Sequence, residues 1–590
     1  MRARTPPLLH FVGTKGVRVL RLARYLKNYR VACVLAPLFK LLEALFGLVV
    51  PLIMAQVIDI GVAAGEKTYI LQRGLLLVAM GLLGMLVAFT AQYFAAKLAA
   101  GFGAELRGDL FRHIMGLARA DLDALGTSTL VTRVTNDTQQ VQDGFNMFFR
   151  LVLRSPFVVF GALALVFSID GTEGLVYTLT ILLILLVVYL VMRVATKLYR
   201  AVQHRLDEVL LRTSENLEGV RVIRAFRRED DEVSRMDETA GDLRREQVHV
   251  GDIAGTLSPL TYAVCNLGLA VALYVGGFKV DAGGLTQGQL VAFVNYSAQI
   301  LVEGVKLANL IVQESKAAAC AARINQVFDT QSSMADGTFD AMREEPKVIF
   351  DDVTFTYTDG AAPALSHVSF TAAPGQTIGV IGGTGSGKST LADLVMRFYD
   401  TTSGTVRIGS HDVRDYSLAS LRRTVGIVEQ GARLFSGTIA SNLRWGDPEA
   451  ADADLERAIE TAQATDVVAA KGGLAGEVEQ LGRNFSGGQR QRLTIARALV
   501  RKPRVLILDD SSSALDFATD AALRRALHRD LAGTTVFLIS QRVTSIQSAD
   551  RICVLDHGSL AGWGTHEELL ATCPVYQEIY ASQVKGGKDE

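Results

Sequence analysis

Six long apolar stretches in the first half of the chain restrict its fold more than any other feature. A helix needs about 20 mostly apolar residues to cross a bilayer. Six stretches reach that length, at 31–62, 74–100, 147–168, 174–195, 257–278 and 290–312. The connectors at 63–73, 169–173 and 279–289 are short, whereas those at 101–146 and 196–256 are long and rich in Arg and Lys. The sequence therefore predicts an all-α membrane domain of six spanning helices.

Basic residues give the expected orientation. Because positive residues stay on the cytoplasmic side of a membrane, both long connectors and both termini should be cytoplasmic. The membrane that we expect is the cell membrane, the inner one of a bacterium. Residues 1–30 alternate basic and apolar side chains, which predicts a basic amphipathic helix on the inner membrane surface; a loose basic tail is the alternative. The net charge of −1 gives no support for a nucleic-acid partner, and we expect none.

The two long connectors keep helical periodicity, which predicts that spanning helices continue far into the cytosol. Polar segments at 127–137 and 215–229 fit turns that dock on another domain. A solvated helical hairpin would have the same pattern, so both interpretations stay open.

Charged residues inside spanning segments are costly and often mark a cavity or pathway. The six found in the inner half of the predicted bundle are Lys40, Glu43, Arg150, Arg154, Glu303 and Lys306. They are candidates for lining a substrate cavity. Pairs spaced i, i+3 can equally neutralise each other at helix ends that reach the cytosol.

The second half of the chain contains a phosphate-binding loop in its required context. A strand-like run at 377–381 leads into the loop, and a helical pattern follows it. The loop comprises Gly382, Gly383, Thr384, Gly385, Ser386, Gly387, Lys388 and Ser389, with Thr390 beginning the helix. Glycines let backbone N–H groups surround phosphate oxygens, Lys388 should reach the β- and γ-phosphates, and the Ser389 hydroxyl should bind Mg²⁺. A chance Gly-rich turn would not be expected between a strand and a helix.

A second acidic motif completes a nucleotide site. The apolar run at 504–508 ends in Asp509, which is typical of a buried parallel strand. Nucleotide phosphates bind at the carboxyl edge of such sheets, so Asp509 is the candidate Mg²⁺-side carboxylate. The second half is therefore predicted to be an α/β P-loop NTPase that uses ATP and Mg²⁺.

Residues 484–492, Asn-Phe-Ser-Gly-Gly-Gln-Arg-Gln-Arg, resemble the signature of the ATP-binding-cassette (ABC) family. The resemblance extends along almost the whole chain, and the six-span half is similar to the exporter fold of that family. It implies a stacking role for Tyr357, a catalytic and Mg²⁺-binding role for Gln430 in the Q-loop, and a nucleotide-binding role for Asp516 in the D-loop. The domains expected are a membrane domain at 1–327, a linker at 328–346, a nucleotide-binding domain at 347–585 and a tail at 586–590.

In this family two cassettes meet head to tail, and each ATP lies between one P-loop and the signature of the other chain. The resemblance thus implies that the signature residues bind the ATP of a second ABC half-transporter. These residues are Ser486, Gly487, Gly488 and Gln489.

Two positions depart from the family pattern, and both concern hydrolysis. Asp510 occupies the position where the family has the catalytic Glu, and Gln541 replaces the switch His. A carboxylate that is one methylene short can cost about 10²-fold in rate, and Gln cannot become cationic. The chain therefore resembles the degenerate-site half of a bacterial heterodimeric multidrug exporter, whose partner supplies both residues; a slow homodimer is the alternative. The loop at 477–483 also departs from the family pattern.

The expected function is ATP-driven export of amphipathic small molecules or lipids across the membrane, with weak hydrolysis at the chain's own site. An importer on the same fold, for example of siderophores, is a second hypothesis. A non-transporting regulatory ATP sensor is a third, and the six spans argue against it.

Overall fold

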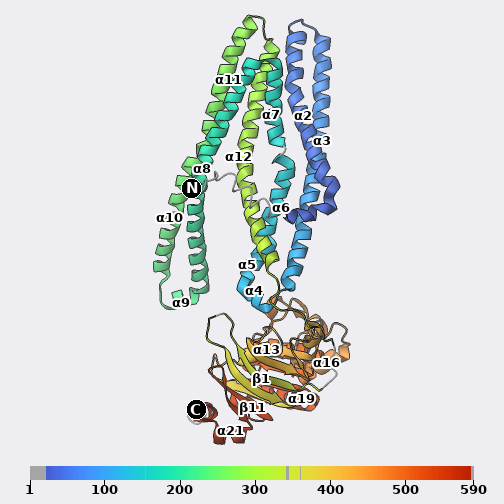
Figure 1. The fold of residues 1–590 in the computed structure, drawn as a ribbon, viewed down its shortest axis with the longest axis vertical. Coiled ribbons are helices and arrows are strands. Elements are labelled where there is room, and N and C mark those ends of the chain that lie inside the picture. Colours follow the sequence, from blue (N-terminus) through green and yellow to red (C-terminus); the bar gives the residue numbers. More distant parts are fainter. Residues whose placement is uncertain (1–20, 153, 341–344, 359, 586–590) are drawn as a thin grey trace, which may run out of the picture. The chain divides into compact units, whose positions relative to one another are not determined.

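The computed structural model describes residues 21–152, 154–340, 345–358 and 360–585. It divides into two compact units (Figure 1). The helical unit comprises the chain up to Met115 together with Ser128–Thr330. The sheet unit comprises Gly116–Thr127 together with the chain from Gln331 onward. The predicted amphipathic helix at 1–30 falls mainly outside the described residues, and a short 3₁₀ helix, η1 (Ala23–Tyr29), precedes the first long helix.

Long helices build the helical unit. The segment of the first predicted span is α2 (Arg30–Gln56) continued by η2 (Val57–Val62), and α3 (Lys67–Met115) follows. The third segment runs through α5 (Thr127–Thr132), η3 (Arg133–Asp137), α6 (Thr138–Met147), η4 (Phe148–Val152) and α7 (Arg154–Ile169). The remaining helices are α8 (Gly171–Glu218), α9 (Val220–Ala225), α10 (Glu229–Gly255), α11 (Leu257–Asp281) and α12 (Gln287–Asp329). The prediction that helices continue from the spans into the two long connectors is confirmed by α3 and α8.

Among the described residues, five helical segments are long and apolar enough to cross a membrane: 23–62, 67–115, 127–169, 171–218 and 229–281. The sixth predicted span lies in α12, which is 43 residues long and carries Glu303 and Lys306. Helix α12 is not among the five, so its crossing of the membrane remains a prediction.

Side-chain caps and small residues explain how these helices begin and pack. Asp170 caps α8 by accepting hydrogen bonds from the backbone N–H groups of Thr172 and Glu173, and Thr286 caps α12 in the same way. Helices α2 and α3 lie side by side (Figure 1). Seven of their 17 buried positions are alanine and one is glycine, and such small residues let neighbouring helices approach closely.

The predicted polar turn at 127–137 is wrong. These residues form α5 and η3, and Asp137 is buried where it pairs with Arg133 and with Arg323 of α12. The turn of this connector is α4 (Arg119–Leu125), which belongs to the sheet unit. The second polar segment does contain a turn, because α9 joins α8 to α10 there and exposes Val222 and Phe226 (Figure 1).

A six-stranded sheet positions the nucleotide motifs in the sheet unit. Its order is β12 (Ser559–Gly564), β11 (Arg551–Asp556), β3 (Thr377–Gly382), β10 (Thr535–Ile539), β9 (Val505–Asp509) and β6 (Val425–Val428). All pairs are parallel except β11 with β12. Every residue of β9 and β10 is buried, as the continuous apolar runs predict. The carboxyl ends of β3, β9 and β10 therefore meet at one edge.

A four-stranded antiparallel sheet and several helices complete the unit. The sheet order is β2 (Leu365–Ala372), β1 (Val348–Phe355), β4 (Ser403–Ile408) and β5 (His411–Asp412). The helices nearest the motifs are α13 (Lys388–Val395), α18 (Gly487–Val500), α19 (Phe517–Asp530) and α20 (Val543–Ile546). The others are α14 (Leu418–Thr424), α15 (Ile439–Leu443), α16 (Asp452–Thr461), α17 (Thr465–Ala470), α21 (His566–Thr572) and α22 (Pro574–Lys585), and β7 (Gly437–Thr438) pairs with β8 (Glu477–Val478).

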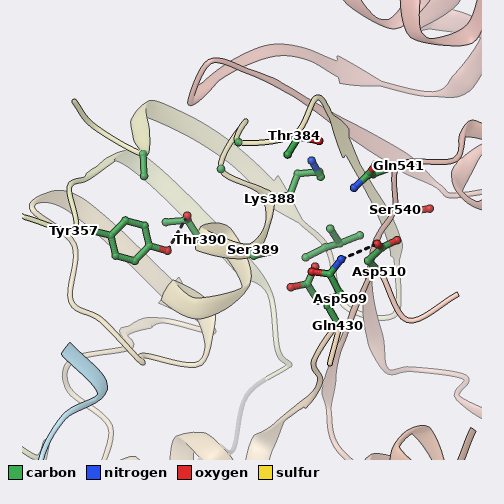
Figure 2. Close-up of a pocket in the computed structure, with 14 residues that line it drawn as sticks. Tyr357, Thr384, Lys388, Ser389, Thr390, Gln430, Asp509, Asp510, Ser540 and Gln541 are labelled. Carbon is green, nitrogen blue, oxygen red and sulfur yellow. Dashed lines mark hydrogen bonds between the residues drawn. The ribbon is translucent and has the colours of Figure 1, made fainter. Parts of the chain in front are cut away.

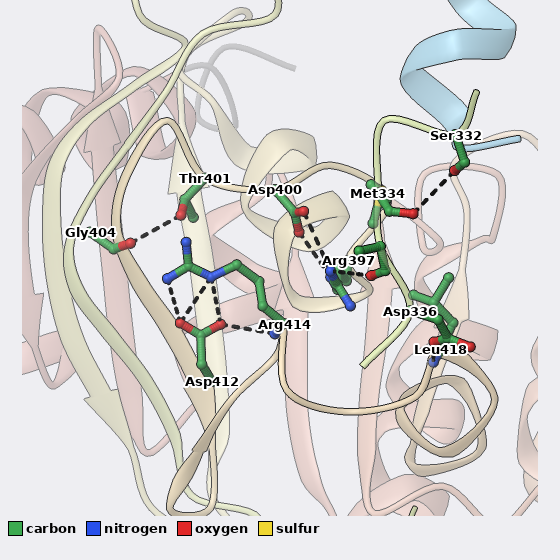
Figure 3. A network of polar contacts seen from close by, with 11 residues as sticks. Ser332, Met334, Asp336, Arg397, Asp400, Thr401, Gly404, Asp412, Arg414 and Leu418 are labelled. Atoms are coloured by element: carbon green, nitrogen blue, oxygen red, sulfur yellow. Dashed lines mark hydrogen bonds and ion pairs between the residues drawn. The ribbon is translucent and has the colours of Figure 1, made fainter. Parts of the chain in front are cut away.

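The predicted linker is held against the sheet unit along residues 331–340. Arg397 donates a hydrogen bond to the carbonyl of Ala335 at 2.9 Å, and the backbone N–H of Leu418 donates to the Asp336 carboxylate at 2.7 Å (Figure 3). Gly337 approaches so closely that a Cβ atom there would lie 2.3 Å from the carbonyl oxygen of Asp415. This segment is therefore a packed part of the sheet unit.

Candidate nucleotide site

The phosphate-binding loop has a backbone that only glycine adopts easily. Gly385 and Gly387 have φ angles of 80° and 96°, in the left-handed region where a Cβ atom is strained. At Gly387 a Cβ atom would also lie 2.6 Å from the carbonyl oxygen of Ala364. The loop runs from the end of β3 into α13, as predicted, so its N–H groups lie at a helix N-terminus that favours anions.

The loop surrounds a cavity of about 350 Å³ (Figure 2). It is lined by Tyr357, Ala364, Thr384, Gly385, Gly387, Lys388, Ser389, Thr390, Gln430, Asp509, Asp510, Ile539, Ser540 and Gln541. The structure thus brings together eleven of the predicted residues from five separate segments of the chain. Gly382, Gly383 and Ser386 belong to the loop without lining this cavity.

Lys388 is partly withdrawn from solvent. Its ammonium group donates hydrogen bonds to the carbonyls of Gly382 at 2.9 Å and Gly383 at 2.7 Å. Burial lowers the pKa of Lys388, and the carboxylates of Asp509 and Asp510 oppose that shift. The amine is therefore held beside the loop, ready to exchange these carbonyls for phosphate oxygens.

Tyr357 offers a flat aromatic surface at the other end of the cavity. It follows β1, its ring is 51% exposed, and its hydroxyl shares a hydrogen bond of 3.0 Å with Thr390. The rings of Phe355 and Tyr399 meet it edge-on, with centroids 4.8 and 5.2 Å away. A base can stack on such a ring, because aromatic faces attract each other.

Ser389 and Asp509 have the donor atoms that Mg²⁺ requires. Asp509 ends β9, burial raises its pKa, and a hydrogen bond with Ser389 opposes the rise. Mg²⁺ prefers one or two protein oxygens together with phosphate oxygens, so this hydroxyl and carboxylate fit a nucleotide-bound ion. When bound, Mg²⁺ would neutralise phosphate charge.

Asp510 and Gln430 contact each other directly. The Gln430 side-chain amide donates to the Asp510 carboxylate at 3.1 Å (Figure 2). Asp510 has a φ angle of 43°, and its N–H donates to the carbonyl of Ile539 at 3.0 Å, which joins the ends of β9 and β10. Burial raises the pKa of Asp510, while the Gln430 hydrogen bond lowers it.

Gln541 lies across the cavity from Asp510. It follows β10 after Ser540, and its side chain is on the Lys388 side in Figure 2. Its carbonyl accepts a hydrogen bond of 2.7 Å from Gln583 of α22. This contact holds the backbone and leaves the side-chain amide directed at the cavity.

The predicted signature residues lie apart from this cavity. Ser486 caps α18, accepting from the Gln489 N–H at 3.3 Å while its own N–H donates to the Gln489 side chain at 2.9 Å. No residue from 484–492 is among those lining the cavity. Asp516 is likewise absent from the lining, and it caps α19 through the N–H of Thr519 at 2.9 Å. The structure therefore does not bring the predicted signature residues or Asp516 to the cavity of their own chain.

Five of the six predicted membrane charges form one cluster in the helical unit. Glu43 of α2 accepts from Lys40 and lies 3.7 Å from Arg154 of α7. Glu303 of α12 accepts from Arg154, from Lys306 at 3.0 Å and from the Ser155 hydroxyl at 2.7 Å. Ser155 was not predicted, since nothing in its neighbouring sequence marks it. The sixth residue, Arg150, has a buried Nε without a hydrogen-bond partner among the described residues.

Comparison with known proteins identifies this arrangement. Residues 33–303 match the family model of the ABC transporter transmembrane region, and residues 365–513 match the ABC transporter model. The chain belongs to the ABC transporter family. It joins one membrane domain of exporter type to one nucleotide-binding domain, and its ATPase is coupled to transport.

Its relatives match over nearly their full length. An uncharacterized ABC transporter ATP-binding protein of Mycobacterium tuberculosis is 34% identical, over 95% of this chain and 97% of that protein. An ATP-dependent lipid A-core flippase of Vibrio vulnificus is 28% identical, over 96% and 98%. A bacterial Atm1-family ABC exporter, solved with ATP bound, superposes with a TM-score of 0.80 at 25% identity, over 95% of this chain and 98% of that one.

The family assignment also bears on assembly. ABC half-transporters pair or dimerise, and the separation of the signature from the cavity agrees with such pairing. Ser540, Ala364 and Ile539 are the lining residues that the sequence did not single out. Ser540 could have been found, because it follows the buried strand β10 directly at the sheet edge that carries the other motifs.

Proposed function

We propose that this chain is the degenerate-site half of a heterodimeric ABC exporter, which binds ATP at its own site and hydrolyses it slowly. The observation that carries the proposal is the contact between Asp510 and Gln430 beside Gln541. The phosphate-binding loop, Tyr357 and Asp509 line the same cavity, whereas the two residues that should activate and sense the attacking water are altered.

The geometry supports slow hydrolysis. Asp510 is directed at the cavity, and its carboxylate is already engaged by Gln430 at 3.1 Å. A Glu would reach about 1.5 Å farther, the length of one C–C bond. Displacement of a catalytic group by 1 Å can cost about 10²-fold in rate. Gln541 can donate a hydrogen bond to a γ-phosphate, but it cannot carry a positive charge.

The intact signature gives this chain a second role. Ser486 caps α18, and Gly487, Gly488 and Gln489 form its first turn. Such a helix start favours phosphate. In the pair, these residues would close over ATP on the P-loop of the partner. Efficient hydrolysis would then occur at the partner's site, while ATP bound to Lys388 and Ser389 keeps the cassettes in contact.

The substrate we propose is an amphipathic small molecule or a lipid. The helical unit exposes many large apolar side chains, as a lipid-facing bundle does. One relative of this chain is named as an ATP-dependent lipid A-core flippase. The charge cluster around Glu303 would line the inner part of the substrate cavity, with both termini of the chain in the cytoplasm.

The proposal is tested by co-expressing the chain with a half-transporter encoded beside it, one that carries Glu and His at the two altered positions. Inside-out vesicles of the pair should accumulate fluorescent dyes or labelled lipids only with ATP. Loss of activity when the partner's catalytic Glu becomes Gln is expected.

Three results would contradict the proposal. Robust ATPase activity after that change would show that the present chain hydrolyses ATP competently. ATP-dependent release from the inside-out vesicles would indicate import instead of export. An ATPase that no substrate stimulates would favour the sensor hypothesis.

A further inference from the structure

Helix α4 is docked on the sheet unit by a small set of polar contacts. The Tyr399 hydroxyl donates to the Asp123 carboxylate at 2.6 Å. Arg119 lies 3.5 Å from Glu429 and 4.0 Å from Asp393, and its guanidinium group lies 5.1 Å from the centre of the Phe398 ring. These contacts come from Arg119, the first residue of this seven-residue helix, and from Asp123, about one helical turn later.

A backbone contact fixes the orientation of α4 relative to the packed linker. Asp121 accepts from the N–H of Ala118 at 3.1 Å and from the N–H of Ser333 at 2.9 Å. The first bond caps the helix and the second joins it to the segment after α12. Rotation of α4 would therefore break the Asp121 contact unless residues around Ser333 moved with it.

Tyr399 also touches the base-stacking residue. Its ring meets Tyr357 edge-on at 5.2 Å with an interplanar angle of 85°, and it lies 5.5 Å from Phe355. One side chain thus contacts Tyr357 through its ring and Asp123 of α4 through its hydroxyl.

The hydrogen bond to Asp123 is of a strong type. Burial and the Asp123 carboxylate raise the pKa of Tyr399 above its usual range, so the phenol keeps its proton and remains the donor. A hydrogen bond to an ionised acceptor is shorter and about twice as strong as one between neutral groups. The contact also orients the ring, because a Tyr side chain has only two torsions.

Helix α4 reaches the other end of the nucleotide cavity as well. Glu429, which pairs with Arg119, immediately precedes Gln430, and Gln430 binds Asp510 beside the phosphate end. Asp123 of α4 therefore contacts a neighbour of the base end, and Arg119 contacts a neighbour of the phosphate end. These two routes can be separated by experiment.

We propose that Tyr399 is a positioning residue that couples the stacking of a base on Tyr357 to the docking of helix α4. The inference rests on the proposed function, since a site that holds ATP without rapid hydrolysis must signal through binding contacts. A base on the exposed face of Tyr357 restricts that ring. The restricted ring fixes Tyr399, and the Asp123 hydrogen bond then stabilises α4 in its docked position.

The test is hydrogen exchange of the backbone at 118–126 in the assembled pair, with and without Mg·ATP. In the unmodified chain ATP should slow exchange there. In Tyr399→Phe the slowing should shrink by about tenfold, the equilibrium ratio for a hydrogen bond to a charged group. Asp123→Ala should have the same effect, and the double variant should be no worse than either single one.

Mg·tripolyphosphate, which has no base, separates the two routes. In the unmodified chain, Mg·tripolyphosphate should slow hydrogen exchange at 118–126 only weakly. The slowing should equal the smaller slowing that Mg·ATP causes in Tyr399→Phe. Equal slowing by tripolyphosphate and ATP in the unmodified chain would overturn the inference, because the phosphate route alone would then suffice.

A matched control removes the same hydroxyl elsewhere. The Tyr416 hydroxyl donates to the carbonyl of Ile408 at 2.7 Å inside the sheet unit, so Tyr416→Phe should leave the response of α4 to ATP intact. Binding of a fluorescent ATP analogue confirms that each variant holds nucleotide. Asp123 lies outside the cavity, so its variant tests the route even if Tyr399→Phe weakens binding.

Full ATP-dependent slowing in Asp123→Ala with nucleotide bound would refute the inference. The change in hydrogen exchange of α4 can be measured whether or not this site hydrolyses ATP. Fast hydrolysis on this chain, together with loss of the α4 response in both variants, would reject the proposed function and support the positioning role.

Discussion

Asp510 is the position where a single substitution should change the chemistry most. In Asp510→Glu the carboxylate moves about 1.5 Å farther into the cavity, the length of one C–C bond. In the unmodified chain the Asp510 carboxylate accepts a hydrogen bond of 3.1 Å from Gln430. A shift of about 1.5 Å is half of that length, so the Glu carboxylate must lie at a different position from that of Asp510. It then reaches the region where water would attack the γ-phosphate.

We expect Asp510→Glu to raise hydrolysis at this site by about 10²-fold, which corresponds to about 2.7 kcal/mol in the barrier. Adding Gln541→His should raise it further, because His can carry a proton near neutral pH. The assay is single-turnover hydrolysis of ATP on this chain, within a pair whose partner has lost its catalytic Glu.

Asp530→Glu is the control, since it adds the same methylene to an exposed carboxylate paired with Arg529, outside the cavity. It should leave the rate unchanged. An unchanged rate in Asp510→Glu, with ATP affinity preserved, would refute the argument that carboxylate position limits hydrolysis.

Three further predictions concern other parts of the chain. In Gly488→Ala the new Cβ atom would lie 2.8 Å from the carbonyl oxygen of Ala514, so ATPase of the pair should fall while this chain still binds ATP in an equilibrium binding assay. In Glu303→Gln the buried cluster loses its acceptor charge, which typically costs 3–5 kcal/mol; thermal unfolding in detergent should show a clear loss, whereas exposed Asp231→Asn should cost less than about 1 kcal/mol. Burial raises the pKa of Asp393 from 3.8 to about 6 despite Arg119, so its contribution to stability is present below pH 4 and lost as the pH rises through 6. Asp393→Asn should remove that part of the pH dependence of the unfolding midpoint, and an unchanged profile would contradict the assignment.

The nucleotide motifs were the most predictable part of the molecule. The P-loop needs glycines for its positive φ angles, and Asp509 ends a strand whose other residues are apolar. Both features can therefore be recognised from neighbouring residues in the sequence. The contact between Gln430 and Asp510 joins residues 80 positions apart. No local pattern encodes it, although the sheet order that brings β6 beside β9 explains it.

Long-range pairing explains where sequence reasoning failed. The segment at 127–137 is polar and was predicted to be a turn, but Arg323, 186 residues later, neutralises Asp137 and allows helix to continue. The residues at 328–346 were predicted only as a linker between the two domains. Phe339 stacks on His411 with centroids 4.1 Å apart, a contact that composition cannot reveal.

The charged cluster in the helical unit could be predicted only in part. The i, i+3 spacing of Lys40 with Glu43 predicted a pair within one helix, and the structure contains that pair. The bridge of Arg154 to both Glu43 and Glu303 depends on the packing of α2, α7 and α12. Only the spatial arrangement shows that the separate pairs form one cluster.

The most direct test of the central claim is the chemical state of the nucleotide held by this chain while the pair turns over. Radiolabelled ATP is bound at this chain, unlabelled ATP then drives several turnovers, and the label retained is analysed after acid quench. The account predicts that most of the label is still ATP. Conversion of the retained label to ADP at the rate of overall turnover would contradict it.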